Sequence, residues 1–180
     1  MKGIVFTEFL EMVESDWSLD MVDRLIERAG VSGAYTAVGA YPDDEMRSLV
    51  AALSRETGSS ESELLRAFGA RLFVRLVLTY PKLFPDVADS FEFLADIENI
   101  VHTQVRKLYP DAELPRIEVE KRAGELALNY FSKRPFADLI HGIVQGCVDH
   151  FGDVARVVRE DPVPGSGAQA RFIVRRMPAS

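Results

Sequence analysis

Histidine and cysteine are the side chains of this sequence with the most direct metal-ligand chemistry, and the chain carries few of them. The histidines are His102, His141 and His150, and Cys147 is the one cysteine. No two histidines are four residues apart, and a single thiol forms neither an intramolecular disulfide nor a cysteine-rich zinc site. No G-x-S-x-G motif supplies a hydrolase nucleophile. We therefore consider ligation of a metal by one histidine, and we predict no enzyme activity.

His102 lies near the end of an apolar helical pattern over residues 90–108. At about 100° per residue, it falls at the edge of the apolar face, flanked by Phe91 and Tyr109. An imidazole there can point into an apolar cavity while its other nitrogen meets backbone or solvent, which suits an axial ligand of haem iron. A half-buried histidine with a satisfied hydrogen bond explains the same pattern. The apolar face consists of Leu94, Ile97, Val101, Val105 and Leu108.

A second polar group follows a strand-like segment and precedes Pro135. Strand alternation places Tyr130, Ser132 and Arg134 on one side. Two hydroxyls and a guanidinium suit a carboxylate, because arginine binds one bidentately and hydroxyls fill its remaining lone pairs. Haem carries two such groups, its propionates. A strand end with a solvated arginine is the alternative.

The apolar periods predict an α+β fold. Helical spacing covers the first hundred residues, alternation typical of strands begins after Pro115, and a further helix is expected over 135–150. Ser60 and Glu63 have the spacing of a capping box at the start of the strongest helix. Two hairpins, the first turning at Gly124, predict a four-stranded antiparallel sheet. We expect one domain over 1–180, with a helical N-terminal lobe (1–60) packed on a C-terminal lobe (61–180) that contains the sheet and the ligating histidine.

Composition restricts the partners. The net charge of −7 argues against a nucleic-acid partner, which requires clustered lysine and arginine. Hydrophobic residues make up 47% of the chain, enough for a substantial core, yet no apolar run approaches the roughly 20 residues of a membrane span. The first residues do not have the pattern of a signal peptide. These features predict a cytoplasmic protein without membrane contact.

The motifs together resemble the haem-nitric oxide/oxygen binding (H-NOX) family, which includes the haem domain of soluble guanylate cyclase. The similarity covers essentially the whole chain. It includes Met1-Lys2-Gly3, Ala67-Phe68-Gly69, His102 followed by Leu108-Tyr109-Pro110, Pro115, and the Tyr-x-Ser-x-Arg motif at residues 130–134. The last motif is specific at its distance from the histidine.

The resemblance implies a haem between the two lobes, with His102 as the iron ligand. It implies that Tyr130, Ser132 and Arg134 hold the propionates, that Pro115 presses on the porphyrin, and that Asp43 pairs with the arginine. The haem is expected to be non-covalent and b-type, since no Cys-x-x-Cys-His motif occurs. Cys147 is expected to be a packed helix residue.

The resemblance also implies which gas is bound. Oxygen-binding members carry a distal tyrosine where this chain has Leu139, and the remaining expected distal residues are also apolar. Bound O₂ needs a hydrogen-bond donor, worth about 1.5–3 kcal/mol for a charged group, whereas NO needs little. We therefore expect a sensor that binds NO and CO and acts on a separate histidine kinase or diguanylate cyclase. An oxygen sensor and a haem-free interaction module are the alternatives. The other expected distal residues are Val5, Phe9, Leu72, Leu76 and Ile143.

Overall fold

A computed structural model describes residues 1–84, 87–110, 112–162 and 165–178 of the chain. Within these ranges the chain is an α+β structure of helices and one antiparallel sheet, as the sequence predicted. The helices are α1 (Gly3–Asp16), α2 (Leu19–Ala29), α3 (Asp43–Thr57), α4 (Glu61–Thr79), η1 (Pro81–Leu83), α5 (Ser90–Ala95), η2 (Glu98–His102), α6 (Thr103–Leu108) and α7 (Ala137–Phe151). The strands are β1 (Arg116–Arg122), β2 (Glu125–Phe131), β3 (Ala155–Glu160) and β4 (Gln169–Arg176).

Local signals in the sequence explain where the helices begin and end. The predicted capping box of α4 is present: the Ser60 hydroxyl accepts from the Glu63 amide at 3.2 Å, and the Glu63 carboxylate accepts from the Ser60 amide at 3.0 Å. Ser18 caps α2 in a similar way, and Gly30 ends that helix in the left-handed conformation. These contacts satisfy amides and carbonyls that would otherwise lack a helical partner.

The four strands form a sheet in the order β1-β2-β4-β3, with every pair antiparallel. Gly124 has φ +72°, so it closes the β1–β2 hairpin in a conformation that favours glycine. Tyr130 lies opposite Ile117 on one side and Ala170 on the other. The two predicted hairpins are thereby confirmed, and the end of β2 is fixed between two neighbouring strands.

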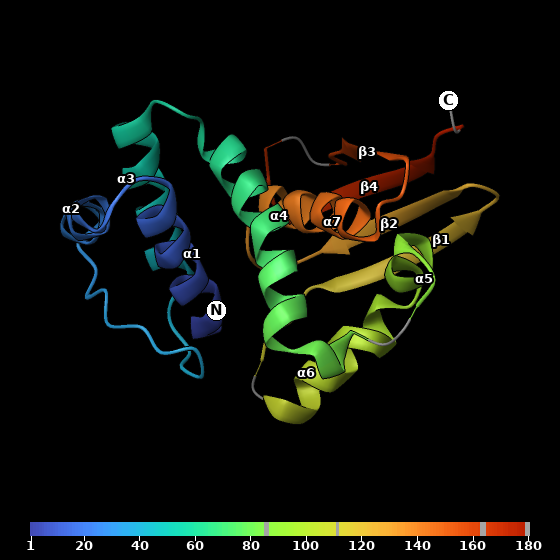
Figure 1. Cartoon of the computed structure of the whole chain (residues 1–180), viewed down its shortest axis with the longest axis horizontal. Helices are drawn as coiled ribbons and strands as arrows, with labels where there is room; N and C mark the ends of the chain where they lie inside the picture. Colours follow the sequence, from blue (N-terminus) through green and yellow to red (C-terminus); the bar gives the residue numbers. More distant parts are fainter. Residues whose placement is uncertain (85–86, 111, 163–164, 179–180) are drawn as a thin grey trace.

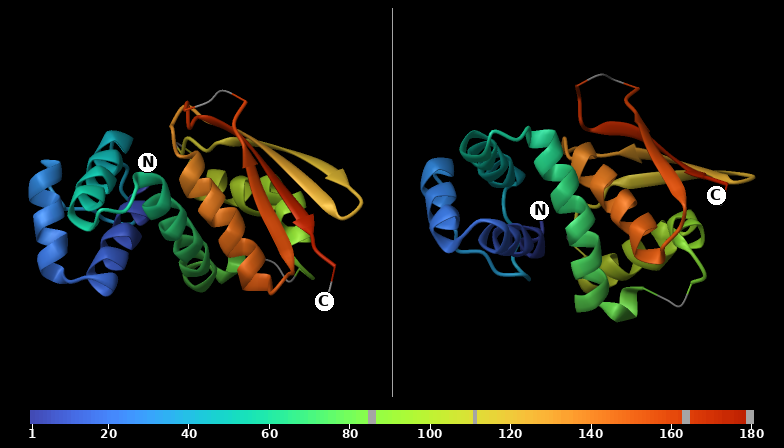
Figure 2. Two further views of the ribbon diagram at one scale, coloured as in Figure 1. Left: turned by 90° about the horizontal axis from the view of Figure 1, so that it is seen from above. Right: turned by 45° about the horizontal axis from the view of Figure 1, so that its top comes forward.

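Helices α4 and α7 lie between the N-terminal helices and the sheet (Figures 1 and 2). Two apolar clusters occupy the two sides of this helix pair. The first joins α1–α3 to one face of α4 and the start of α7, and the second joins α7, α5 and η2 to the sheet. Phe68 belongs to the first cluster and Phe73 to the second, while Ile143 packs against both. Helix α4 is therefore apolar on two sides.

Glycines bring the backbones of α4 and α7 into direct contact. A Cβ atom on Gly142 would stand 2.0 Å from the carbonyl oxygen of Arg66, and one on Gly69 would stand 2.2 Å from that of Leu139. Gly146 approaches the Ala70 carbonyl in the same way. No larger side chain fits these positions unless the helices separate. We call Gly69, Gly142 and Gly146 the glycine seam.

The predicted single helix over 90–108 is wrong: the segment forms three pieces. Helix α5 ends at Ala95, Asp96 leaves the helical conformation, and Glu98–His102 form a π-helical turn before α6. The Glu98 carbonyl accepts from the Thr103 amide and also from the Thr103 hydroxyl at 2.9 Å. This added bond stabilises the wider turn. The turn ends at His102, and such turns are frequent at functional sites.

Candidate haem site

His102 is a buried side chain whose orientation is fixed by a carboxylate. Its Nδ1 atom lies 2.9 Å from Oε1 of Glu98, one helical turn earlier. The His102 side chain is 10% exposed, so this contact is largely shielded from water. With Nδ1 bonded to the carboxylate, Nε2 is the nitrogen that can bind a metal. The structure thus gives His102 the second partner that metal-binding histidines usually have.

Glu98 also connects His102 to the sheet and to α6. Its Oε1 accepts from the backbone amide of Ile117 in β1 at 3.2 Å, and its Oε2 accepts from Arg106 at 3.2 Å. Burial raises the pKa of Glu98, but the hydrogen bonds from His102, Ile117 and Arg106 outweigh it, and the net pKa lies below its usual value. Glu98 is therefore a fixed negative charge beside the imidazole.

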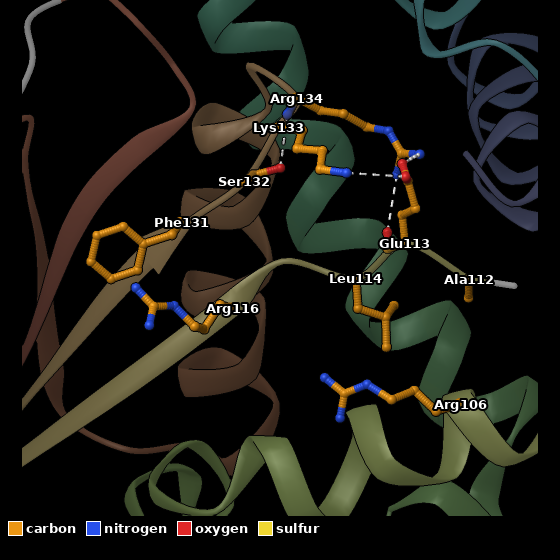
Figure 3. Close-up of a pocket in the computed structure, with 9 residues that line it drawn as sticks. All are labelled: Arg106, Ala112, Glu113, Leu114, Arg116, Phe131, Ser132, Lys133 and Arg134. Atoms are coloured by element: carbon orange, nitrogen blue, oxygen red, sulfur yellow. Dashed lines mark hydrogen bonds and ion pairs between the residues drawn. The ribbon is translucent and has the colours of Figure 1, made fainter. Parts of the chain in front are cut away.

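Tyr130, Ser132 and Arg134 are positioned by the end of β2 and the turn after it. Tyr130 is buried within the strand, and burial raises its pKa, while Ser132 and Arg134 act to lower it. The Ser132 amide donates to the Ala168 carbonyl, and the Ser132 hydroxyl accepts from the Arg134 amide at 3.0 Å. Strand alternation stops at Phe131, so this turn, rather than the predicted alternation, directs Arg134 (Figure 3).

The Arg134 guanidinium is surrounded by acceptors from distant parts of the chain. Its Nη2 donates to Oε2 of Glu113 at 2.8 Å, its Nη1 donates to the Glu113 carbonyl at 3.0 Å, and its Nε lies 3.3 Å from Oδ1 of Asp43. Lys133 approaches the same Glu113 carboxylate at 3.5 Å (Figure 3). The predicted pairing of Asp43 with Arg134 is confirmed.

The contacts of Arg134 show which kind of group this part of the site can bind. Glu113 already places a carboxylate on Arg134, so the guanidinium and its neighbours have the geometry to bind that group. A cavity of about 440 Å³ opens beside this contact, lined by Ser132 and Arg134. A second cavity of about 380 Å³ lies toward the N-terminus and is lined by Val5 and Arg134. The donor set fits a cofactor that carries carboxylates.

Most of the expected distal residues belong to the first apolar cluster. Phe9, Leu72 and Leu139 are buried in it, and Val5, Leu76 and Ile143 are half-buried against it. Of these six residues, Val5 alone lines either cavity. His102 and Tyr130 also lie outside the cavity linings. Pro115 is half-buried and directly precedes β1.

Glu98 and Glu113 were not among the residues predicted from the sequence. The four-residue spacing of Glu98 and His102 on a helical segment could have identified the first of them. Glu113 carries no local signal, because its contact with Arg134 spans 21 residues.

Other kinds of site find no support in the described part of the chain. No group of three or more potential metal ligands from histidine, cysteine, aspartate and glutamate occurs there. None of the helices described combines the length and the apolar character that crossing a membrane requires. Cys147 is buried in the second apolar cluster, as expected for a packed helix residue.

The fold and the candidate site define an α+β domain that contains one buried histidine bound to a carboxylate and one arginine bound to a second carboxylate. A family model described as "Haem-NO-binding" matches residues 2–159, and the chain belongs to this family of haem-binding gas sensors, the H-NOX family. A search of curated proteins found no match. Members of this family are sensor domains.

Solved structures agree with this assignment. An H-NOX protein from K. algicida, solved as unliganded Fe(II), is 37% identical with a TM-score of 0.92, and the match covers 99% of this chain and 98% of that one. An H-NOX from Shewanella woodyi, solved bound to IWP-051 in the Fe(II)CO state, is 35% identical with a TM-score of 0.84, covering 99% and 95%. An S. oneidensis H-NOX in the Fe(II)NO state is 22% identical with a TM-score of 0.91, covering 99% and 100%, and shows the shared fold.

Proposed function

We propose that this chain is a haem-based sensor of NO that regulates a separate signalling protein. The observation that carries the proposal is the presence of two sites in one α+β fold: a buried histidine whose Nδ1 lies 2.9 Å from a carboxylate oxygen, and an arginine already bound to a carboxylate. Family membership supplies the cofactor class. We propose the b-type, non-covalent form because the one cysteine, Cys147, is buried and belongs to no haem-attachment motif.

In this proposal His102 binds the iron through Nε2, and Tyr130, Ser132 and Arg134 bind the propionates. A propionate would replace the Glu113 carboxylate on Arg134, whereas Asp43 would continue to neutralise the guanidinium. Pro115, at the start of β1, would contact the porphyrin. Haem held by these residues would supply the iron to which a gas molecule binds, and His102 would be the protein ligand whose bond to that iron NO weakens.

Selectivity for NO over O₂ is proposed from the character of the distal residues. Leu139, Leu72 and Phe9 are buried and have no side-chain hydrogen-bond donor. A donor to bound O₂ is worth about 1.5–3 kcal/mol, or roughly 10- to 150-fold in affinity. Without it, the chain would bind NO and CO and discriminate against O₂. The S. woodyi and S. oneidensis proteins, solved in Fe(II)CO and Fe(II)NO states, support binding of these gases by the fold.

In this proposal His102 transmits the effect of gas binding from the haem to the surrounding helices and sheet. It ends the π-helical turn and connects through Glu98 to β1, so weakening its bond would alter contacts of both α6 and the sheet. Packed interfaces respond by adopting discrete alternative arrangements. A histidine kinase or a diguanylate cyclase in the cytoplasm is the proposed receiver. The net charge of −7 disfavours a nucleic acid in that role.

Absorption spectroscopy of the reduced protein tests the function. We expect a Soret band of a five-coordinate ferrous haem, a further change on addition of NO, and no stable oxy spectrum in air. A stable oxy spectrum would establish the oxygen-sensor alternative instead. Absence of a Soret band after incubation with haemin would favour the haem-free interaction module.

Substitution of the histidine tests the ligand assignment. His102→Gly should lose the histidine-ligated spectrum and regain it with free imidazole, because the small ligand can occupy the vacated space. His150→Gly is the matched control, since His150 is exposed near the end of α7 and should leave the spectrum unchanged. Loss of the spectrum in the control, or its persistence in His102→Gly, would contradict the assignment.

A further inference from the structure

The Glu98 carboxylate is a strong polar partner of the candidate iron ligand. We propose that Glu98 is a positioning residue that strengthens the bond from His102 to haem iron and thereby opposes its loss when NO binds. This inference rests on the proposed function. Glu98 would therefore limit the fraction of NO-bound protein that loses the bond between His102 and iron, and it lies in the same π-helical turn as the histidine.

The geometry allows Glu98 to act on one nitrogen only. Its Oε1 lies 2.9 Å from Nδ1, so the Nδ1 proton is held there and Nε2 keeps its lone pair for the metal. A carboxylate that accepts from the second nitrogen of a ligating imidazole also raises the basicity of the ligand. Because His102 is buried, water competes weakly for the Nδ1 proton. Both effects favour an intact bond between His102 and iron.

Two other donors hold Glu98 in place and moderate its effect. The Ile117 amide binds the same Oε1 at 3.2 Å and ties the carboxylate to β1. Arg106 binds Oε2 at 3.2 Å and draws negative charge away from the imidazole side. Glu98 and Arg106 should therefore have opposite influences on the histidine ligand. Removing the carboxylate weakens the ligand, whereas removing the guanidinium strengthens it.

Variants of the haem-loaded full-length chain test these opposite signs. Glu98→Leu removes the acceptor, Glu98→Gln keeps an acceptor oxygen without the charge, and Arg106→Gln removes the competing cation. Glu118→Gln is the matched control, because Glu118 is an exposed glutamate in the neighbouring strand β1, paired with Arg116 at 2.9 Å.

The measurements are the iron–histidine stretching frequency of the reduced protein, the reduction potential, and the ratio of five- to six-coordinate NO complex. For Glu98→Leu we expect a lower frequency, a higher potential and a larger five-coordinate ratio. Loss of such a partner typically weakens metal binding about 10- to 100-fold, and we expect the ratio to increase by a similar factor. Glu98→Gln should lie between Glu98→Leu and the wild type. Arg106→Gln should shift the frequency and the potential in the opposite direction.

The outcomes separate this inference from the proposed function. If the wild type has an iron–histidine band and its frequency is unchanged in Glu98→Leu, Glu98→Gln and Arg106→Gln, the role of Glu98 is overturned. The proposed function would be unaffected by that result. A wild type without that band would overturn the proposed ligand and this inference with it. If Glu98→Leu does not retain haem, the inference is tested by Glu98→Gln and Arg106→Gln, whose iron–histidine frequencies should shift in opposite directions. Shifts of the same sign in these two variants would also overturn the inference.

Discussion

Glu113 occupies the position on Arg134 that we assign to a haem propionate, so its removal should make haem binding stronger. The Glu113 and Arg134 side chains meet at 2.8 Å and are 58% and 23% exposed. An ion pair with that exposure contributes about 0–1 kcal/mol. Glu113→Gln should therefore raise the haem affinity by no more than about fivefold. The backbone contact of Glu113 with Arg134 remains in this variant.

Arg134→Ala should have the opposite and larger effect. It removes a charge-assisted bond to the propionate, worth about 1.5–3 kcal/mol, and so lowers the affinity about 10- to 150-fold. Competition for haem between each variant and a high-affinity acceptor protein measures both changes. Asp44→Asn is the control, because Asp44 is exposed and pairs with Arg47 instead. Weaker haem binding by Glu113→Gln would show that Glu113 orients the arginine and would refute the replacement of one carboxylate by the other.

Three further predictions follow from packing and burial. Gly142→Ala should lower the free energy of unfolding by about 1–3 kcal/mol, because its Cβ would lie 2.0 Å from the Arg66 carbonyl oxygen. An unchanged midpoint of urea unfolding would contradict the close backbone contact at the glycine seam. Burial, together with the positive charges of Arg66 and Arg159, lowers the pKa of His141, so the folded protein favours the neutral imidazole. The free energy of unfolding should therefore fall as the pH drops below about 6.5. His141→Leu should reduce this dependence of stability on pH, and it also removes a buried Nδ1 that has no partner among the described residues. Burial raises the pKa of the Cys147 thiol, so a thiol reagent at pH 8 should label the protein after unfolding in urea but not before.

The fold was predictable because its signals are local. The capping box at Ser60 and the hairpin turn at Gly124 each involve residues close in sequence, and both appear where expected. The break after Ala95 was not predictable from the apolar pattern, which continues through it without proline or glycine. A hydroxyl–carbonyl contact of Thr103 and the tertiary contact of Glu98 with β1 accompany the wider turn instead.

The candidate site was predictable in its residue types and less so in its connections. His102 and Arg134 were identified from their positions in the chain, and the structure gives each a buried or half-buried setting. Their acidic partners differ in how far apart they lie in sequence. Glu98 is one helical turn from His102, whereas Asp43 reaches Arg134 from a separate helix and was found only through the resemblance.

The glycine seam also restricts how a displacement can travel through the molecule. Because the backbones of α4 and α7 are in contact at these glycines, changes of side-chain rotamer cannot let the two helices slide past each other. We therefore expect α4 and α7 to move as one rigid unit. We therefore expect a displacement to act on the contact between α1 and α4, where Arg71 pairs with Asp16 and Arg75 pairs with Glu8 and Glu11. The pairs of Arg71 with Asp16 and of Arg75 with Glu11 are exposed and contribute little to stability, whereas the Glu8 carboxylate is buried and accepts from two nitrogens of Arg75. Charged side chains therefore join α1 to α4, whereas glycines join α4 to α7.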